Sequence, residues 1–152
     1  MRIYRIADGR HPLWDGTGAL LHGGRWNSPG RPAIYACASY AGAMLEVLVH
    51  ARIGKLPRTH RVVSADLPDD LGIDRIDGAM LRPGWDAAES SIAREIGDQW
   101  LASLHTAVLM VPSVVAREEY NVVVNPMHPD AARIQVGPPR PVIWDTRLFP
   151  GD

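Results

Sequence analysis

The sequence has 152 residues, a length that suits one compact domain over residues 1–152 with a single hydrophobic core. Hydrophobic residues make up 46% and charged residues 22%, which are values of an ordinary globular protein and exclude a disordered or fibrous chain. Sixteen basic and seventeen acidic residues give a formal net charge of -1, so the sequence offers no broad attraction to nucleic acid or to an anionic membrane.

The first third of the chain predicts two strands and one helix. Residues 2–7, "RIYRIA", alternate like a strand, and residues 7–32 follow as a long irregular segment rich in glycine and proline. Irregular segments of this length are uncommon in compact domains unless they have a function. Residues 33–38 predict a short buried strand, after which Ser39 can cap a helix over residues 40–52. The apolar stripe expected on this helix consists of Met44, Leu45, Leu48 and Val49.

The remainder predicts one more helix and several β-rich runs. Residues 59–67 alternate like a strand, and residues 68–84 carry several turn signals typical of a loop. A second helix is predicted from Asp86, which has capping-box spacing with Glu89, and its apolar face would be Ile92, Ile96, Trp100 and Leu104. Short β-rich runs complete the chain at residues 107–113, 120–126, 132–136 and 141–149. Because strands outnumber helices without regular alternation, the fold class is predicted to be α+β.

One cysteine, Cys37, cannot form an internal disulfide, and its apolar setting favours a buried, unreactive thiol. The N-terminus lacks the apolar core of a signal peptide, and no apolar run approaches the roughly 20 residues that span a bilayer. We therefore expect a cytoplasmic protein.

Two charged residues stand out because of their neighbours. Arg25 lies in a "GGRWN" turn, where its guanidinium could hold a phosphate or carboxylate through two parallel hydrogen bonds, or pair with a surface aspartate. Glu46 lies between Leu45 and Val47, at the edge of the expected apolar stripe. It could point to solvent, or it could be a site carboxylate that needs a partner. The residues alone leave both questions open.

Other candidates have weaker signals. Tyr35 belongs to an apolar strand and would ordinarily be a core residue, although a strand end can present an aromatic face to a ligand. Ser113 follows a strand, where its hydroxyl could orient a partner or satisfy a turn. Polar side chains surround the strand in "NVVVNPMHP", where bridging of loops is the expected role, at Asn121, Asn125 and His128.

Several common motifs are missing from the sequence. It contains no G-x-G-x-x-G, no Walker A motif and no G-x-S-x-G elbow, so a bound nucleotide must be held in another way and a serine hydrolase is disfavoured. Its histidines lack the paired spacing of a zinc site, and Cys37 has no cysteine partner. We expect no metal.

These residues, in this order, resemble the RES-domain family, which is named for an arginine, a glutamate and a serine. The matching stretches are "GGRWNSPGRPAIYACAS", "AMLEVLVH" and "VPSVVAREEYNVVVNPMHP", with supporting blocks "YRI", "IGDQWL" and "WDTRLF". The resemblance covers nearly the whole chain. Its compact length is similar to that of stand-alone toxins of type II toxin–antitoxin pairs, including Par-type members.

The resemblance implies a fold related to the ADP-ribosylating toxins, with a split β-rich core and flanking helices, and NAD as the substrate. Family members are described as transferring ADP-ribose to a protein target, or as destroying NAD with phosphate or water as acceptor. The resemblance also implies a cognate antitoxin with a helix-turn-helix domain, whose tail occludes the active site. The antitoxin would contact DNA in place of this chain.

The same resemblance implies roles for individual residues. Glu46 would face the cation that develops on the ribose, Arg25 would clamp the pyrophosphate or ribose, and Tyr35 would stack on nicotinamide. Ser113 would orient Glu46 or bind the substrate. Weaker candidates for binding NAD are Asn125, Arg5 and His22. A third interpretation, a catalytically silent binding module, is disfavoured because the arginine, tyrosine and glutamate are all retained.

Overall fold

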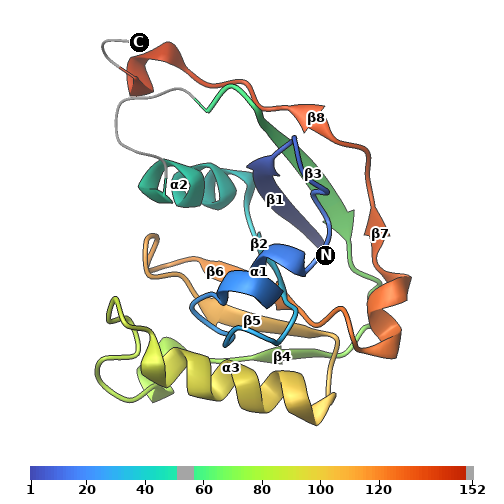
Figure 1. The fold of residues 1–152 in the computed structure, drawn as a ribbon, viewed down its shortest axis with the longest axis vertical. Helices are drawn as coiled ribbons and strands as arrows, with labels where there is room; N and C mark the ends of the chain where they lie inside the picture. The colour runs from blue at the N-terminus through green and yellow to red at the C-terminus, as the bar shows by residue number, and fades with distance from the viewer. Residues whose placement is uncertain (51–56, 150–152) are drawn as a thin grey trace.

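The computed structural model describes residues 1–50 and 57–149, which form one curved sheet with three α-helices (Figure 1). The strand order is β4-β5-β6-β2-β1-β3-β7, and β8 pairs with the other part of β3. The strands are β1 (Arg2–Asp8), β2 (Ile34–Cys37), β3 (His60–Asp66), β4 (Ile73–Arg75), β5 (Val108–Pro112), β6 (Tyr120–Val124), β7 (Gln135–Val136) and β8 (Arg140–Pro141). The α-helices are α1 (Thr17–His22), α2 (Tyr40–His50) and α3 (Ser91–Ser103).

The sheet is split between β1 and β2. These strands share one residue pair, Tyr4 with Cys37, whereas β1 and β3 pair over seven residues. Arg5 bridges the divergence with its side chain, because its Nη1 donates to the Tyr35 carbonyl at 2.7 Å and its Nε to the Leu13 carbonyl at 2.7 Å. The predicted α+β class with a split β-rich core is confirmed.

Helix α2 begins where the sequence predicts, but it presents a different face to the sheet. The Gly42 amide donates to the Ser39 hydroxyl at 2.9 Å, which confirms Ser39 as the cap. The predicted stripe is wrong in part, since Leu45 is 38% and Val49 54% exposed, whereas Met44 and Leu48 are half-buried. The small residues Gly42 and Ala43 are buried instead, because they let the helix lie close to β1 and β2. The predicted helical residues 51 and 52 lie outside the described part of the chain.

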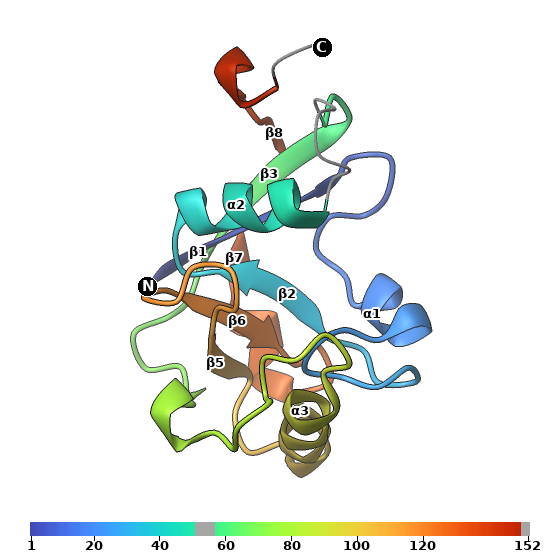
Figure 2. The same ribbon diagram turned by 90° about the vertical axis from the view of Figure 1, so that its left-hand side faces the viewer.

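Helix α3 starts later than its sequence signals indicate. Asp86 and Glu89 do not form its cap, because Asp86 pairs with Arg117 at 2.8 Å and the N-cap position falls at Ser90. Leu104 is the C-cap in a left-handed conformation and is 47% exposed, so it does not extend the apolar face. Helix α3 packs on the β5 and β6 side of the sheet, at the opposite end from α2 (Figure 2). The buried residues of α3 are Ala93, Gly97, Trp100 and Leu101.

Three other segments differ from the predictions. The irregular segment contains the short helix α1, and the predicted loop over residues 68–84 contains β4, which pairs in parallel with β5. The β-rich runs at residues 132–136 and 141–149 form only the two-residue strands β7 and β8, while the 3₁₀ turns Pro129–Arg133 and Thr146–Leu148 take much of the rest. The short strands β4, β7 and β8 form because they pair with strands that are distant in the sequence. Within the described residues, no helix is long and apolar enough to cross a membrane.

Candidate active site

Arg25 lies on a turn between α1 and β2. The turn closes with the Gly24 amide donating to the Asn27 carbonyl at 2.9 Å. Gly24 is required by close approach, because a Cβ atom there would lie 2.6 Å from the Tyr35 hydroxyl oxygen. The half-buried Arg25 donates from Nη1 to the carbonyls of Ala87 at 2.9 Å and Trp85 at 3.4 Å. The guanidinium is therefore held against the segment that precedes α3.

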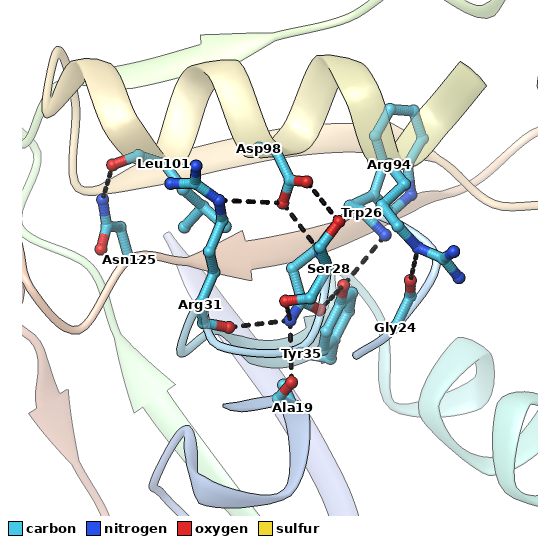
Figure 3. A network of polar contacts seen from close by, with 11 residues as sticks. Ala19, Gly24, Trp26, Ser28, Arg31, Tyr35, Arg94, Asp98, Leu101 and Asn125 are labelled. Carbon is cyan, nitrogen blue, oxygen red and sulfur yellow. Dashed lines mark hydrogen bonds and ion pairs between the residues drawn. The ribbon is translucent and has the colours of Figure 1, made fainter. Parts of the chain in front are cut away.

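Tyr35, on β2, holds this turn through its hydroxyl group. Its hydroxyl donates to Asn27 Oδ1 at 2.6 Å and accepts from the Trp26 amide at 3.0 Å (Figure 3). Burial raises the pKa of the Tyr35 hydroxyl well above its usual value, so the group remains a donor at neutral pH. Asn27, itself fully buried, donates to the carbonyls of Ala19 at 2.9 Å and Arg31 at 2.8 Å. These hydrogen bonds attach the turn to α1 and to β2.

Helix α3 fixes the other side of the turn. Asp98 accepts the Ser28 amide at 2.8 Å and the Ser28 hydroxyl, and it lies 3.6 Å from the Arg31 guanidinium (Figure 3). Gly97 touches the turn directly, since a Cβ atom there would lie 1.8 Å from the Trp26 carbonyl oxygen. The "IGDQWL" block therefore docks the Arg25 turn onto α3.

Glu46 points inward from α2 toward the strands. Its Oε1 accepts from Ser113 Oγ at 3.2 Å and from Asn121 Nδ2 at 2.7 Å. Its Oε2 lies 3.7 Å from His50 Nε2, and the side chain is 22% exposed. Of the two interpretations left open by the sequence, the structure favours a partnered carboxylate over one directed into solvent.

Cys37 lies on β2, near the carboxylates of Glu46 and Glu119. Burial, with the nearby carboxylates of Glu46 and Glu119, raises the pKa of the Cys37 thiol to about 12. A thiol in this state is protonated at neutral pH and is a poor nucleophile. The predicted burial of Cys37 is confirmed, and its low reactivity stays a prediction.

A pocket of 520 Å³ is lined by hydrogen-bond partners of both regions. Ser113, which donates to Glu46, lines it on one side, and Trp85, whose carbonyl accepts from Arg25, lines it on another. Arg75 also lines the pocket, with its guanidinium 4.0 Å from the centre of the Tyr120 ring. The pocket thus borders residues that contact both the predicted carboxylate and the predicted arginine.

The structure does not bring every predicted residue to this cluster. Asn125 is buried at the far end of β6, where it donates to the Leu101 carbonyl at 3.0 Å and accepts from the Met127 amide at 3.1 Å. Arg5 is occupied at the split in the sheet. His22 is exposed at the end of α1. His128 accepts from the Asp130 amide at 3.1 Å, which confirms the structural role expected of it.

Asn121 was expected from the sequence only to bridge loops, whereas its side-chain amide donates to Glu46. It lies about 13 Å from Asn125 along the strand direction, because the two are four residues apart. Its register opposite both Cys37 and Val111 places it beside α2. In the sequence, the alternation of β6 indicated only that Asn121 lies on the same face as Val123, two residues further on. The pairing of β6 with β2 and β5 was needed to place this face beside Glu46.

The chain belongs to the RES domain family, because the family model matches residues 2–145. It is 39% identical to the Prs ADP-ribosylating toxin of Sphingobium over 137 residues, covering 88% of this chain and 85% of that protein. It is 41% identical to Toxin Res of Pseudomonas putida over 138 residues, covering 88% and 91%. A chain of the MbcT–MbcA toxin–antitoxin complex of M. tuberculosis has the same fold, with a TM-score of 0.76, 22% identity and coverage of 93% and 83%.

Proposed function

We propose that this chain is the toxin of a type II toxin–antitoxin module, and that it cleaves NAD at the nicotinamide–ribose bond and transfers ADP-ribose to a cellular protein. The observation that carries the proposal is the partnered Glu46, whose donor Ser113 lines a pocket together with Trp85, a hydrogen-bond partner of Arg25. The names of relatives at 39% and 41% identity support it.

Glu46 is proposed to stabilise the transition state by its charge. Departure of nicotinamide leaves positive charge on the ribose, as in the oxocarbenium-like transition state of glycoside hydrolysis. A carboxylate 4 Å from that charge gives a gross attraction of about 4 kcal/mol at an effective dielectric of 20. This attraction corresponds to roughly a thousandfold in rate before the cost of desolvating the carboxylate is subtracted.

Arg25 and Tyr35 are proposed to hold the dinucleotide. Among the described residues, the bonds of the Arg25 guanidinium all leave from Nη1, so Nε and Nη2 can serve a phosphate or a ribose. The hydroxyl bonds of Tyr35 fix the orientation of its ring, which would stack on nicotinamide. Contacts of NAD with Ser113, Asn125, Arg5 and His22 stay predictions. NAD would be a substrate, with no metal.

The partners follow from the same proposal. A cognate antitoxin with a helix-turn-helix domain would occlude the site in the cytoplasm, and a cellular protein would accept ADP-ribose. The chain itself would bind neither nucleic acid nor a membrane, in keeping with its formal charge of -1.

Labelled NAD tests the proposal directly. The purified chain is mixed with NAD carrying the label in its adenylate part, with and without phosphate and with cell lysate. Label on a lysate protein supports transfer to protein. ADP-ribose 1″-phosphate or free ADP-ribose indicates instead an NAD phosphorylase or glycohydrolase, and unchanged NAD in every mixture contradicts both reactions. Expression without the antitoxin should slow growth, and normal growth despite soluble expression would contradict the toxin assignment.

A further inference from the structure

We propose that Asn121 is a positioning residue, which together with Ser113 holds Oε1 of Glu46 so that Oε2 is the oxygen that faces the substrate. The inference rests on the proposed function and deepens it, because it assigns different duties to the two oxygens of one carboxylate. Both hydrogen bonds from the sheet end on the same atom, Oε1, at 3.2 Å from Ser113 and 2.7 Å from Asn121.

The donor role of Ser113 is fixed by its other bonds. Its Oγ accepts the amides of Val115 at 3.2 Å and Ala116 at 3.0 Å, which occupies both lone pairs of the hydroxyl. The single hydroxyl proton is then left for Glu46. Ser113 therefore acts as a donor to the carboxylate, and its position is set by the turn that follows β5.

The donor role of Asn121 follows from its place in the sheet. Its backbone pairs with Cys37 on one side and Val111 on the other, so the side chain has a fixed origin on β6. An amide nitrogen 2.7 Å from a carboxylate oxygen donates, whereas the amide oxygen in that place would be repelled. Asn121 thus holds Oε1 of Glu46 in place by donating a hydrogen bond to it.

The β5–β6 connection also holds α2 at a second point. Glu119 accepts a hydrogen bond from Ser39, the residue that caps the helix. A carboxylate at the first turn of a helix is favoured by the partial positive charge there. One segment, residues 113–121, therefore fixes both the start of α2 and the side chain of Glu46, while Oε2 is approached only by the exposed His50 among the described residues.

The test replaces the amide with a carboxylate of the same shape. In Asn121→Asp, two carboxylates would lie within about 3 Å, and such pairs bind a proton at a higher pH than a lone carboxylate does. We expect NAD cleavage to fall about 100-fold at neutral pH through kcat, with KM nearly unchanged, and to recover only partly at alkaline pH. Gln99→Glu, which adds the same charge on the exposed side of α3, is the matched control and should keep the wild-type pH profile.

Asn121→Ala separates positioning from charge. It should lower kcat about tenfold without moving the pH profile, because it removes the donor and adds no charge. The carbon-13 signal of the Glu46 carboxyl group supplies a readout without substrate. It should titrate over a higher pH range in Asn121→Asp than in the wild type or in Gln99→Glu. An unshifted signal together with a wild-type pH profile of cleavage would overturn the inference. A shifted signal in a protein that leaves NAD intact would refute the proposed function and leave the positioning of Glu46 standing.

Discussion

The Arg25 turn and the Glu46 cluster are held in different ways. The turn has contacts with three neighbouring elements: Asn27 bonds to α1, Tyr35 closes it from β2, and Gly97 with Asp98 docks it on α3. Among the residues that the structure describes, Glu46 has two hydrogen bonds, both to one oxygen. The turn is therefore part of the fold's own stability, whereas the carboxylate can be changed at low cost to folding.

This contrast predicts where substitutions act. Changes around the turn should lower the free energy of unfolding first and NAD binding second. Changes at the carboxylate should lower turnover and leave the free energy of unfolding nearly unchanged. Substitutions with graded effects on the turn can test the first half of this contrast.

Gly97→Ala should have the largest effect on folding. The added Cβ atom would lie 1.8 Å from the Trp26 carbonyl oxygen, so helix and turn must separate. We expect the free energy of unfolding to fall by at least about 3 kcal/mol, measured by chemical denaturation. The matched control is Gly18→Ala on α1, where no atom lies within 4 Å of the added Cβ. Equal stability of the two variants would contradict docking of the turn on α3.

Asp98→Ala should have the next largest effect, because it removes the acceptor for two bonds from Ser28. We expect a loss of about 2 kcal/mol in the free energy of unfolding. The KM for NAD should rise, since the turn that carries Arg25 loses its support. Glu95→Ala is a control on the same helix, and it breaks the exposed ion pair of Glu95 with Arg82, which precedes the helix. It should lower the free energy of unfolding by less than about 1 kcal/mol. A KM that stays at the wild-type value would separate Asp98 from the substrate site.

Tyr35→Phe should have a smaller effect that divides the two proposed duties of the residue. It leaves Asn27 Oδ1 and the Trp26 amide without the hydroxyl, at an expected cost of about 1 to 2 kcal/mol in the free energy of unfolding. The ring remains, so stacking on nicotinamide should persist and the KM for NAD should change little. Tyr35→Leu, which also removes the ring, should raise KM. Identical KM values in both variants would contradict the stacking role.

Cys37 should show the smallest response of all. Because its pKa is raised to about 12, the thiol is protonated at neutral pH and begins to ionise only under strongly alkaline conditions. Iodoacetamide should therefore modify the folded protein far more slowly than the urea-unfolded chain at the same pH, as followed by mass spectrometry. Equal rates would contradict burial of Cys37 beside the carboxylates.

Local chemistry predicted several parts of the structure correctly. Ser39 could be recognised as a cap because the bond that defines it spans three residues. Strands β1, β2, β3, β5 and β6 could be recognised because their alternation or apolar character lies within the strand itself. The arginine, glutamate and serine could be named from the sequence, and the fold joins the last two by a direct hydrogen bond.

Contacts between distant residues explain what the sequence could not predict. The apolar residues of α2 suggested a face containing Leu45 and Val49, but close packing on the sheet selects the face with Gly42 and Ala43. That choice turns Glu46 inward. Strand β4 exists through its parallel partner β5, more than 30 residues away in sequence. Asn121 could be placed beside Glu46 only after the register of β6 was known.

The most direct test of the account is the turnover of Glu46→Gln. The glutamine oxygen can accept the bonds from Ser113 and Asn121, so only the charge is lost, and circular dichroism and the free energy of unfolding should match the wild type. We predict that this variant still binds labelled NAD but cleaves it roughly a thousandfold more slowly. Cleavage at near wild-type speed by this folded variant would contradict a charge-stabilising role for Glu46.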